Sequence, residues 1–185
     1  MQKFENGGNT SLELELTYLA SHVPTEINGV SPIVMEDTYF PEDQSIHAHL
    51  RVRAKDNRYE ITKKVSVVKG DASAHVESTI PLDTDEFSAL SAASSRKVRK
   101  DRFKTMIDGH QAEVDIFRGL LTGLVLIDFE FESYEDKASF EPPASCLVDV
   151  TQEEFLAGGV LSGRTYKDIE PELTRLGYQK LQVDS

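Results

Sequence analysis

The feature that most constrains the fold of this chain is a repeated alternation of apolar and polar residues. Residues 12–17, for example, read Leu-Glu-Leu-Glu-Leu-Thr. Neighbouring residues of a β-strand point to opposite faces, so this two-residue period predicts strands with one apolar and one polar face. Segments that we interpret as strands in this way lie at 12–17, 34–40, 47–55, 58–64, 75–80, 95–106, 113–116 and 124–133.

Turn and helix signals join these strands. Asp56-Asn57 and Asp108-Gly109 are typical of tight turns between antiparallel strands. Acidic residues after Pro81 predict a helix over about 84–94, and two short helices are expected at about 151–157 and 168–177. Many hairpin-linked strands with few helices indicate a mainly β (α+β) fold, either an antiparallel barrel or a strongly curved sheet.

Length and composition narrow the class of protein. The 185 residues contain no repeat, low-complexity tract or convincing linker, which predicts one domain over 1–185, with 1–10 as a flexible N-terminal tail. No apolar run approaches the roughly 20 residues of a membrane span, and the first residues lack the apolar core of a signal peptide. A single cysteine, Cys146, excludes an internal disulfide and a Cys-rich zinc site. We therefore expect a cytoplasmic protein without a membrane partner.

The charge of the chain is unevenly distributed. The formal net charge is −12, which argues against a nucleic-acid partner. However, residues 51–69 hold seven lysines and arginines against two acids, and residues 96–104 hold six against one. These 28 residues carry +10 and the other 157 carry −22. A fold that brings the two basic segments together could still bind a compact polyanion.

The polar strand faces are sorted by the sign of their charges. Carboxylates recur two residues apart in three strands and cations do so in two, so each pair points in one direction. For any one strand, a simply solvated face remains an open alternative. Clustered carboxylates suit Mg²⁺, Mn²⁺ or Ca²⁺, whereas guanidinium and ammonium groups suit phosphate oxygens. The carboxylate pairs are Glu13/Glu15, Glu113/Asp115 and Asp128/Glu130, and the cation pairs are Arg51/Arg53 and Lys97/Arg99.

Several motifs, in order along residues 12–162, resemble those of the CYTH superfamily of triphosphate tunnel metalloenzymes. This superfamily includes inorganic and thiamine triphosphatases and class IV adenylyl cyclases. Thr17 stands where the first family motif, Glu-x-Glu-x-Lys, has its lysine, and His75-x-Glu77 stands where the family has an acidic pair. The motifs that carry the resemblance are Glu13-Leu-Glu-Leu-Thr17, Asp37-Thr-Tyr-Phe40, His49-Leu-Arg-Val-Arg53, Tyr59-Glu-Ile-Thr-Lys-Lys64, Lys97-Val-Arg99, Glu113-Val-Asp-Ile-Phe117 and Asp128-Phe-Glu-Phe131.

The resemblance implies an eight-stranded antiparallel β-barrel, closed or nearly closed, with a triphosphate held in its tunnel and Mg²⁺ or Mn²⁺ as cofactor. Residues implied to bind the metal are Glu13, Glu15, Asp115, Asp128 and Glu130, and those implied in catalysis are Glu13, Glu15 and Glu130. Residues implied to bind substrate are Arg51, Arg53, Lys64, Lys97, Arg99 and Glu77. Glu113 could bind metal or pair with a cation, and His49 is expected on the face of Arg51. The residues placed on the solvated outer face are Lys63, Arg96, Lys100 and Arg102.

Three functions are compatible with this sequence. The first is a metal-dependent triphosphatase that hydrolyses the terminal phosphoanhydride of inorganic tripolyphosphate or of an organic triphosphate. The second is an adenylyl cyclase of class IV type, for which the sequence shows no adenine site. The third is a non-catalytic polyphosphate-binding module, which Thr17 makes credible because a hydroxyl supplies no charge. In each case the partner is a small polyphosphate or triphosphate, and the protein is expected to be a monomer or homodimer.

Overall fold

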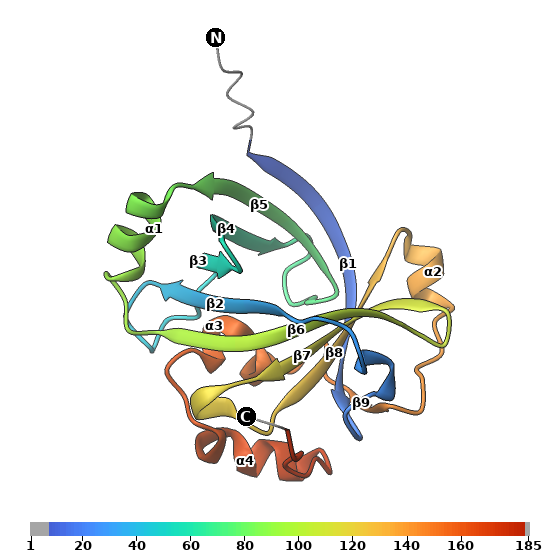
Figure 1. Cartoon of the computed structure of the whole chain (residues 1–185). Coiled ribbons are helices and arrows are strands. Elements are labelled where there is room, and N and C mark those ends of the chain that lie inside the picture. Colours follow the sequence, from blue (N-terminus) through green and yellow to red (C-terminus); the bar gives the residue numbers. More distant parts are fainter. Residues whose placement is uncertain (1–7, 184–185) are drawn as a thin grey trace.

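Eight strands close into an antiparallel barrel, to which a short ninth strand is added (Figure 1), as predicted for the eight. The structure is a computed structural model that describes residues 8–183. Of the tail predicted over 1–10, residues 1–7 lie outside this described part, whereas Asn9 and Thr10 already belong to a strand. The strands are β1 (Asn9–Ala20), β2 (Ile33–Phe40), β3 (Leu50–Lys55), β4 (Arg58–Ser66), β5 (Ala74–Leu82), β6 (Lys97–Ile107), β7 (His110–Phe117), β8 (Val125–Phe131) and β9 (Cys146–Asp149).

The pairing of β1 closes the ring. The order around the barrel is β5-β4-β3-β2-β6-β7-β8-β1, and β1 pairs back with β5. On that side the first half of β1 pairs with β5 and its last residues pair with β9, while β8 runs along its other side. The strand β9 was not predicted, because four residues are too few to show an alternation.

The tight turns set the register of two hairpins. Asp56 and Asp108 have positive φ angles of 52° and 49°, and Gly109 has a φ of 84°. Asparagine, aspartate and glycine tolerate this left-handed region best. The Asp108-Gly109 turn places Ile107 opposite His110, and every later pair of β6 and β7 follows from that register.

The helices are short and lie outside the barrel. The predicted helix at 84–94 is α1, which begins with a capping box between Asp83 and Glu86 and ends at Ser91. The segment predicted as a helix at 151–157 instead contains a 3-10 turn, η3 (Glu154–Leu156), followed by α3. The helices are α1 (Thr84–Ser91), α2 (Tyr134–Ala138), α3 (Gly158–Leu161) and α4 (Tyr166–Arg175), and the other 3-10 turns are η1 (Thr25–Ile27) and η2 (Gly119–Leu121).

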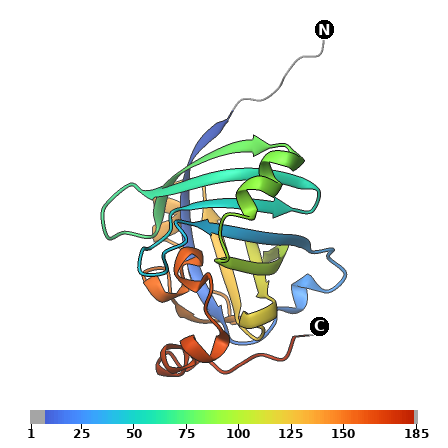
Figure 2. The same cartoon turned by 90° about the vertical axis from the view of Figure 1, so that its left-hand side faces the viewer.

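Inward-facing side chains change from charged to apolar along the barrel. On β1, Glu13 and Thr17 are followed by Leu19, and on β8, Asp128 is preceded by Leu126. At the apolar end, the C-terminal helices pack against the barrel and close the core (Figure 2). A second core lies between the outer faces of β1, β7 and β8 and the segments that cover them, which include η1 and Phe140. In the described part of the chain, no helix is long and apolar enough to cross a membrane.

Candidate functional site

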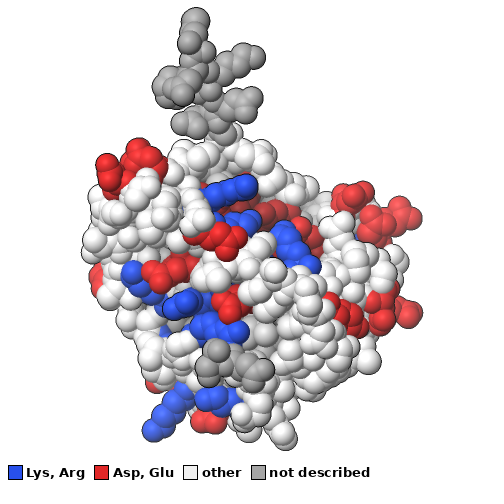
Figure 3. Space-filling view, in the orientation of Figure 1, with Lys and Arg blue, Asp and Glu red and all other residues white. Residues whose placement is uncertain are grey.

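The charged part of the barrel interior surrounds a cavity of about 1450 Å³. All eight barrel strands line it, and residues 150–159 contribute at its apolar end. Seen along the barrel, lysines and arginines gather with carboxylates in the hollow within the ring of strands (Figure 3). The alternating sequences therefore direct their polar faces inward, and the apolar faces of several strands pack under covering segments.

Cations and carboxylates occupy opposite arcs of this interior. Strands β4, β3 and β6 supply the cations, with β2 and its Asp37 between β3 and β6, and the adjacent strands β7, β8, β1 and β5 supply most carboxylates. The inward cations include Arg51, Arg53, Lys64, Lys100, Arg102 and Lys104. The inward carboxylates of the opposite arc are Glu113, Asp115, Asp128, Glu130, Glu13, Glu15 and Glu77. A ligand in the cavity would thus contact positive groups on one side and negative groups on the other.

Arg53 is held by a buried carboxylate. Its Nε lies 2.6 Å from Asp37 Oδ1 and its Nη2 lies 2.7 Å from Asp37 Oδ2, which is the bidentate geometry typical of strong arginine–carboxylate pairs. Although burial would raise the pKa of Asp37, the Arg53 guanidinium holds it well below its usual range. Asp37 also accepts a hydrogen bond from Tyr39. Arg53, predicted to bind substrate, lies in the site with much of its donor capacity already used.

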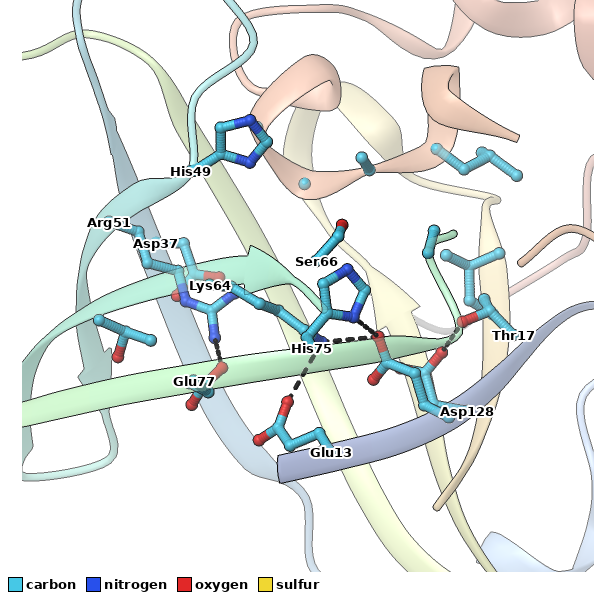
Figure 4. A pocket seen from close by; sticks show the side chains of 18 of the residues that line it. Glu13, Thr17, Asp37, His49, Arg51, Lys64, Ser66, His75, Glu77 and Asp128 are labelled. Atoms are coloured by element: carbon cyan, nitrogen blue, oxygen red, sulfur yellow. Dashed lines mark hydrogen bonds and ion pairs between the residues drawn. The ribbon is translucent and has the colours of Figure 1, made fainter. Parts of the chain in front are cut away.

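Arg51 has one buried donor without an acceptor in the described part of the chain. Its Nη2 lies 3.2 Å from Glu77 Oε2, while its buried Nε has no hydrogen-bond partner among the described residues. A buried donor without an acceptor costs free energy, which an anionic oxygen would recover. Glu77, which the resemblance implied to bind substrate, pairs with this arginine (Figure 4). Arg51 therefore lines the cavity with a guanidinium whose hydrogen-bonding capacity is not fully used.

Lys64 lies between two carboxylates of β1 (Figure 4). Its Nζ is 2.6 Å from Glu15 Oε1 and 3.2 Å from Glu13 Oε2. Burial would lower the pKa of Lys64, but Glu15 and Glu13 raise it, so its ammonium stays charged. His75 lies beside them, with Nδ1 3.5 Å from Glu15 Oε1. Three predicted residues, Glu13, Glu15 and Lys64, are thus brought together, with a histidine that the sequence had not singled out for the site.

The inward face of β6 was predicted wrongly, because the residues that face the cavity are one position away from those expected. Lys97 and Arg99, predicted to bind substrate, point outward, where Lys97 pairs with Glu36 at 3.1 Å and keeps 46 % of its side chain exposed. Lys100 and Arg102, predicted to be solvated, point into the cavity. The reason is that charges occupy both faces of this strand, so alternation alone cannot choose the inward face. Arg96, also placed outside, is buried and belongs to the structural core.

A signal in the sequence could have found the inward face of β6. A two-residue Asp108-Gly109 turn pairs Arg102 with Asp115 and Lys104 with Glu113. Residues directly opposite in an antiparallel pair point to the same face. Since the carboxylates of β7 were expected to face inward, the turn implied that Arg102 and Lys104 do as well.

Arg102 is the most connected cation of the site. Its Nε and Nη2 each lie 2.6 Å from an oxygen of Asp115, its Nη1 donates to Glu113, and its Nη2 lies 3.2 Å from Asp128 Oδ2. Burial would raise the pKa of Asp115, but Arg102 and then Lys100 lower it to about 2. Asp115, predicted as a metal ligand, lies in the site with both oxygens engaged by cations. Glu113 also pairs with Lys104 at 2.5 Å.

Three carboxylates facing the cavity lack sufficient positive charge. Burial, followed by the effect of Asp115, raises the pKa of Asp128 to about 7, although Arg102 opposes this. Burial and then Glu113 raise the pKa of Glu130. The pKa of Glu13 is also raised, because burial and the neighbouring Glu77 together outweigh the lowering effect of Lys64. Glu15 and Glu130 also stand directly opposite in the β1–β8 pair. Such an arrangement is unfavourable unless protons or a cation neutralise it.

Asp128→Asn is expected to change the pH dependence of stability. With a pKa near 7 in the folded chain against 3.8 as its ordinary value, Asp128 binds its proton more tightly when folded. This contribution is complete below about pH 4 and is lost as the pH rises through about 7. From pH 5 to pH 8, measured by urea unfolding in EDTA, the free energy of unfolding of wild type should therefore fall by on the order of 2–4 kcal/mol relative to that of the variant. A difference that is the same at both pH values would contradict the raised pKa.

The carboxylate arc fits a hard divalent cation by its chemistry. Its donors are oxygens, which Mg²⁺ and Mn²⁺ prefer, and the Lys64 ammonium takes a cation's place between Glu13 and Glu15. As the side chains of residues 8–183 lie, no three His, Cys, Asp or Glu residues converge closely enough to hold a metal ion. Binding of a metal here would therefore require Lys64 and the carboxylates to change rotamer.

Thr17 and two histidines also line the cavity. Thr17 Oγ1 donates to Asp128 Oδ1 at 2.8 Å, so it shares that carboxylate with Arg102. An arginine of β6 thus reaches the same carboxylate as the residue that stands in the place of the family lysine. His49, expected on the face of Arg51, lies at the edge of the cavity and stacks on His47 at 4.3 Å between ring centroids.

Comparison with known proteins shows the family to which this barrel belongs. No family model matches the chain. It is 30% identical over 145 residues to the inorganic triphosphatase of Nitrosomonas europaea, which covers 77% of this chain and 91% of that protein. The chain belongs to the CYTH, or triphosphate tunnel metalloenzyme, superfamily.

Solved structures share the CYTH fold. The crystal structure of an inorganic triphosphatase is 24% identical with a TM-score of 0.60, over 81% of this chain and 93% of the other. A proposed adenylate cyclase of Bacillus halodurans is 18% identical with a TM-score of 0.53, over 88% and 97% of the two chains. At these identities the likeness supports the fold alone.

Proposed function

We propose that this CYTH protein is a metal-dependent triphosphatase that hydrolyses the terminal phosphoanhydride of inorganic tripolyphosphate or of an organic triphosphate. The observation that carries the proposal is the division of one cavity into a cation arc and a carboxylate arc. A metal–triphosphate complex has the matching division, because its phosphate oxygens are negative and its metal is positive. The similarity to the inorganic triphosphatase of Nitrosomonas europaea supports the same activity.

The cation arc would bind and orient the phosphate chain. Arg51 lines the cavity with an unsatisfied Nε that a change of rotamer would expose, and Lys64 can exchange its carboxylates for phosphate oxygens. Arg102 and Lys100 lie deeper around Asp115, where they can stabilise charge on the phosphoryl group as it is transferred. Arg53 acts mainly through its pair with Asp37, which fixes the wall between β2 and β3.

The carboxylate arc would hold Mg²⁺ or Mn²⁺ and orient the attacking water. Glu13, Glu15, Asp128 and Glu130 are the residues we assign to the metal, with Asp115 behind them. A bound metal would polarise the phosphate oxygens and neutralise developing charge. Without a metal, burial raises the pKa of Glu13 and of Glu130; a bound cation would lower both, which would keep them as carboxylates able to hold the metal and position water.

The proposed function is tested by following both phosphate release and cyclic AMP. The purified chain is incubated with tripolyphosphate, ATP and pyrophosphate, each with Mg²⁺, with Mn²⁺ or with EDTA. We expect phosphate from tripolyphosphate and loss of this release in EDTA. Cyclic AMP from ATP would instead identify an adenylyl cyclase. Tight binding without turnover of any of these compounds would leave a polyphosphate-binding module.

Glu13→Gln is expected to reduce phosphate release by about 100-fold or more, since loss of one metal-binding carboxylate removes several kcal/mol of transition-state stabilisation. The matched control is Glu36→Gln, because Glu36 lies on the outer face of β2 and pairs there with Lys97. The control should retain wild-type activity. Equal activity of Glu13→Gln and wild type at every metal concentration would remove Glu13 from the proposed metal site.

A further inference from the structure

Lys64 reaches from the cation arc of the cavity into its carboxylate arc. The strand β4 that carries it pairs with β3, and the backbone N–H of Lys64 donates to the carbonyl oxygen of His49, two residues before Arg51. The ammonium of Lys64, however, lies between Glu13 and Glu15 of β1 (Figure 4). Within residues 8–183 it is the one side chain that forms ion pairs with both of these carboxylates. The base of this side chain therefore belongs to one arc and its charged end to the other.

The ammonium occupies the place that a metal ion bound by the two carboxylates would need. Glu13 and Glu15 are two of the proposed metal ligands, and Lys64 Nζ lies 3.2 Å from Glu13 Oε2 and 2.6 Å from Glu15 Oε1. With Lys64 in this position, no His, Cys, Asp or Glu residues of the described chain form a group of three that could hold a metal ion. An ammonium and a divalent cation at one place repel each other. Lys64 must therefore leave before Glu13 and Glu15 can bind a metal together.

The free-energy cost of moving Lys64 depends on the partner that it meets next. Its four-carbon stem is flexible, so the ammonium can turn back towards the cation arc. Glu77 stands opposite Lys64 on β5, but this carboxylate is already paired with Arg51. An ammonium that is three-quarters buried and has lost its carboxylates would then lie near a guanidinium, which is unfavourable.

Phosphate oxygens would supply the partner that Lys64 lacks in the cation arc. A triphosphate held there would lie close to both Lys64 and Arg51, and its negative charge would compensate the two cations. Moving Lys64 away from Glu13 and Glu15 is then an exchange of one anionic partner for another. The same movement therefore costs little in the presence of triphosphate and much in the presence of a metal ion alone.

We propose that Lys64 couples metal binding to triphosphate binding, because its ammonium closes the Glu13–Glu15 site to a metal ion alone and opens it when phosphate oxygens take up the ammonium. This inference rests on the proposed function and adds to it a regulation of the same site. Coupling of this kind is reciprocal, so the metal increases the affinity for triphosphate by the same factor as triphosphate increases the affinity for the metal.

Titration with Mn²⁺ alone tests the competition between Lys64 and the metal. The electron paramagnetic resonance signal of free Mn²⁺ gives the dissociation constant of the full chain without any substrate. Lys64→Met should bind Mn²⁺ at least about 50-fold more tightly than wild type, since it removes the competing charge from between Glu13 and Glu15. The matched control is Lys104→Met, which removes one positive charge from the same cavity but from Glu113, and it should change the affinity less than about fivefold.

A triphosphate analogue measures the coupling itself. Bis(methylene) triphosphonate has CH₂ groups in place of both bridging oxygens and therefore cannot be hydrolysed. At buffered concentrations of free Mn²⁺, wild type should bind Mn²⁺ at least about 10-fold more tightly with this analogue than without it. The gain should be smaller in Lys64→Met, because its carboxylates are already open to the metal.

Thermal unfolding provides a second readout and shows that the variants fold. Addition of Mn²⁺ alone should raise the melting temperature of Lys64→Met more than that of wild type, since a ligand stabilises a folded chain according to its affinity. The proposal would be overturned if Lys64→Met bound Mn²⁺ no more tightly than wild type, or if Lys104→Met gained as much affinity as Lys64→Met. Neither result depends on hydrolysis, so a lack of phosphate release from tripolyphosphate would count against the proposed function and not against this coupling.

Discussion

Arg102→Met is expected to lower triphosphate hydrolysis by about 1,000-fold or more, the scale on which arginines act in phosphoryl transfer. The guanidinium of Arg102 contacts Asp115, Glu113 and Asp128 at once. Its removal takes a positive charge from the cavity and leaves three carboxylates close together without it. Phosphate would then meet a more negative wall, and Asp115 would lose the main cause of its low pKa.

Two further variants of β6 distinguish the effect of an arginine's position from the effect of its charge. Arg99→Met is the matched control, because Arg99 lies on the same strand with its side chain exposed on the outer face. It should leave kcat and KM unchanged. Arg102→Lys keeps the charge but loses the paired contacts to Asp115, so its activity should lie between those of wild type and Arg102→Met. Loss of activity in Arg99→Met with retention in Arg102→Met would reverse our assignment of the inward face.

Arg96→Met is expected to destabilise the fold by about 3–5 kcal/mol, because it leaves a group of buried carbonyls without a donor. The fully buried guanidinium donates to the backbone oxygens of Pro41, Asp43, Ile46 and Gly159, and its Nε lies 3.1 Å from Ser162 Oγ. These contacts join the loop after β2 to α3. For a chain of this size the melting temperature should fall by about 10 °C.

The control for this loss is Arg164→Met, since Arg164 is exposed close by in sequence to α3. Thermal unfolding of the control should match that of wild type within about 1 °C. Equal melting temperatures for Arg96→Met and wild type would mean that the carbonyls find water instead. Because Arg96 does not line the cavity, the folded fraction of the variant should keep wild-type KM, which distinguishes its structural role from that of Arg102.

Local patterns predicted the strands and the inward direction of most candidate residues. Glu13, Glu15, Asp128 and Glu130 point into the cavity as the alternation indicated, and so do Arg51, Arg53 and Lys64. The inward face of β6 could not be chosen in this way, because Lys97, Arg99, Lys100 and Arg102 place cations on both faces. The alternation gave no indication that Arg96 is buried, because its hydrogen-bond acceptors are backbone oxygens that any sequence supplies.

The net charge of the chain likewise does not predict what its cavity binds. A chain at −12 is an improbable binder of a polyanion if every charge is on the surface. The closed ring of strands places Arg51, Lys64, Lys100 and Arg102 inside, where neighbouring carboxylates balance them. The charge that a ligand meets is therefore the charge of the interior, which composition averages with that of the exterior.

The sequence by itself determined the strands, the tight turns and the sorting of charge by sign, because each follows from residues within a few positions of one another. The tertiary structure decided which cations share the cavity and which carboxylates they neutralise. Those properties arise only when β1 pairs with both β8 and β5, so that residues as distant as Lys64 and Glu15, or Thr17 and Asp128, come into contact. Such contacts depend on the register and closure of the whole ring, which no local segment encodes.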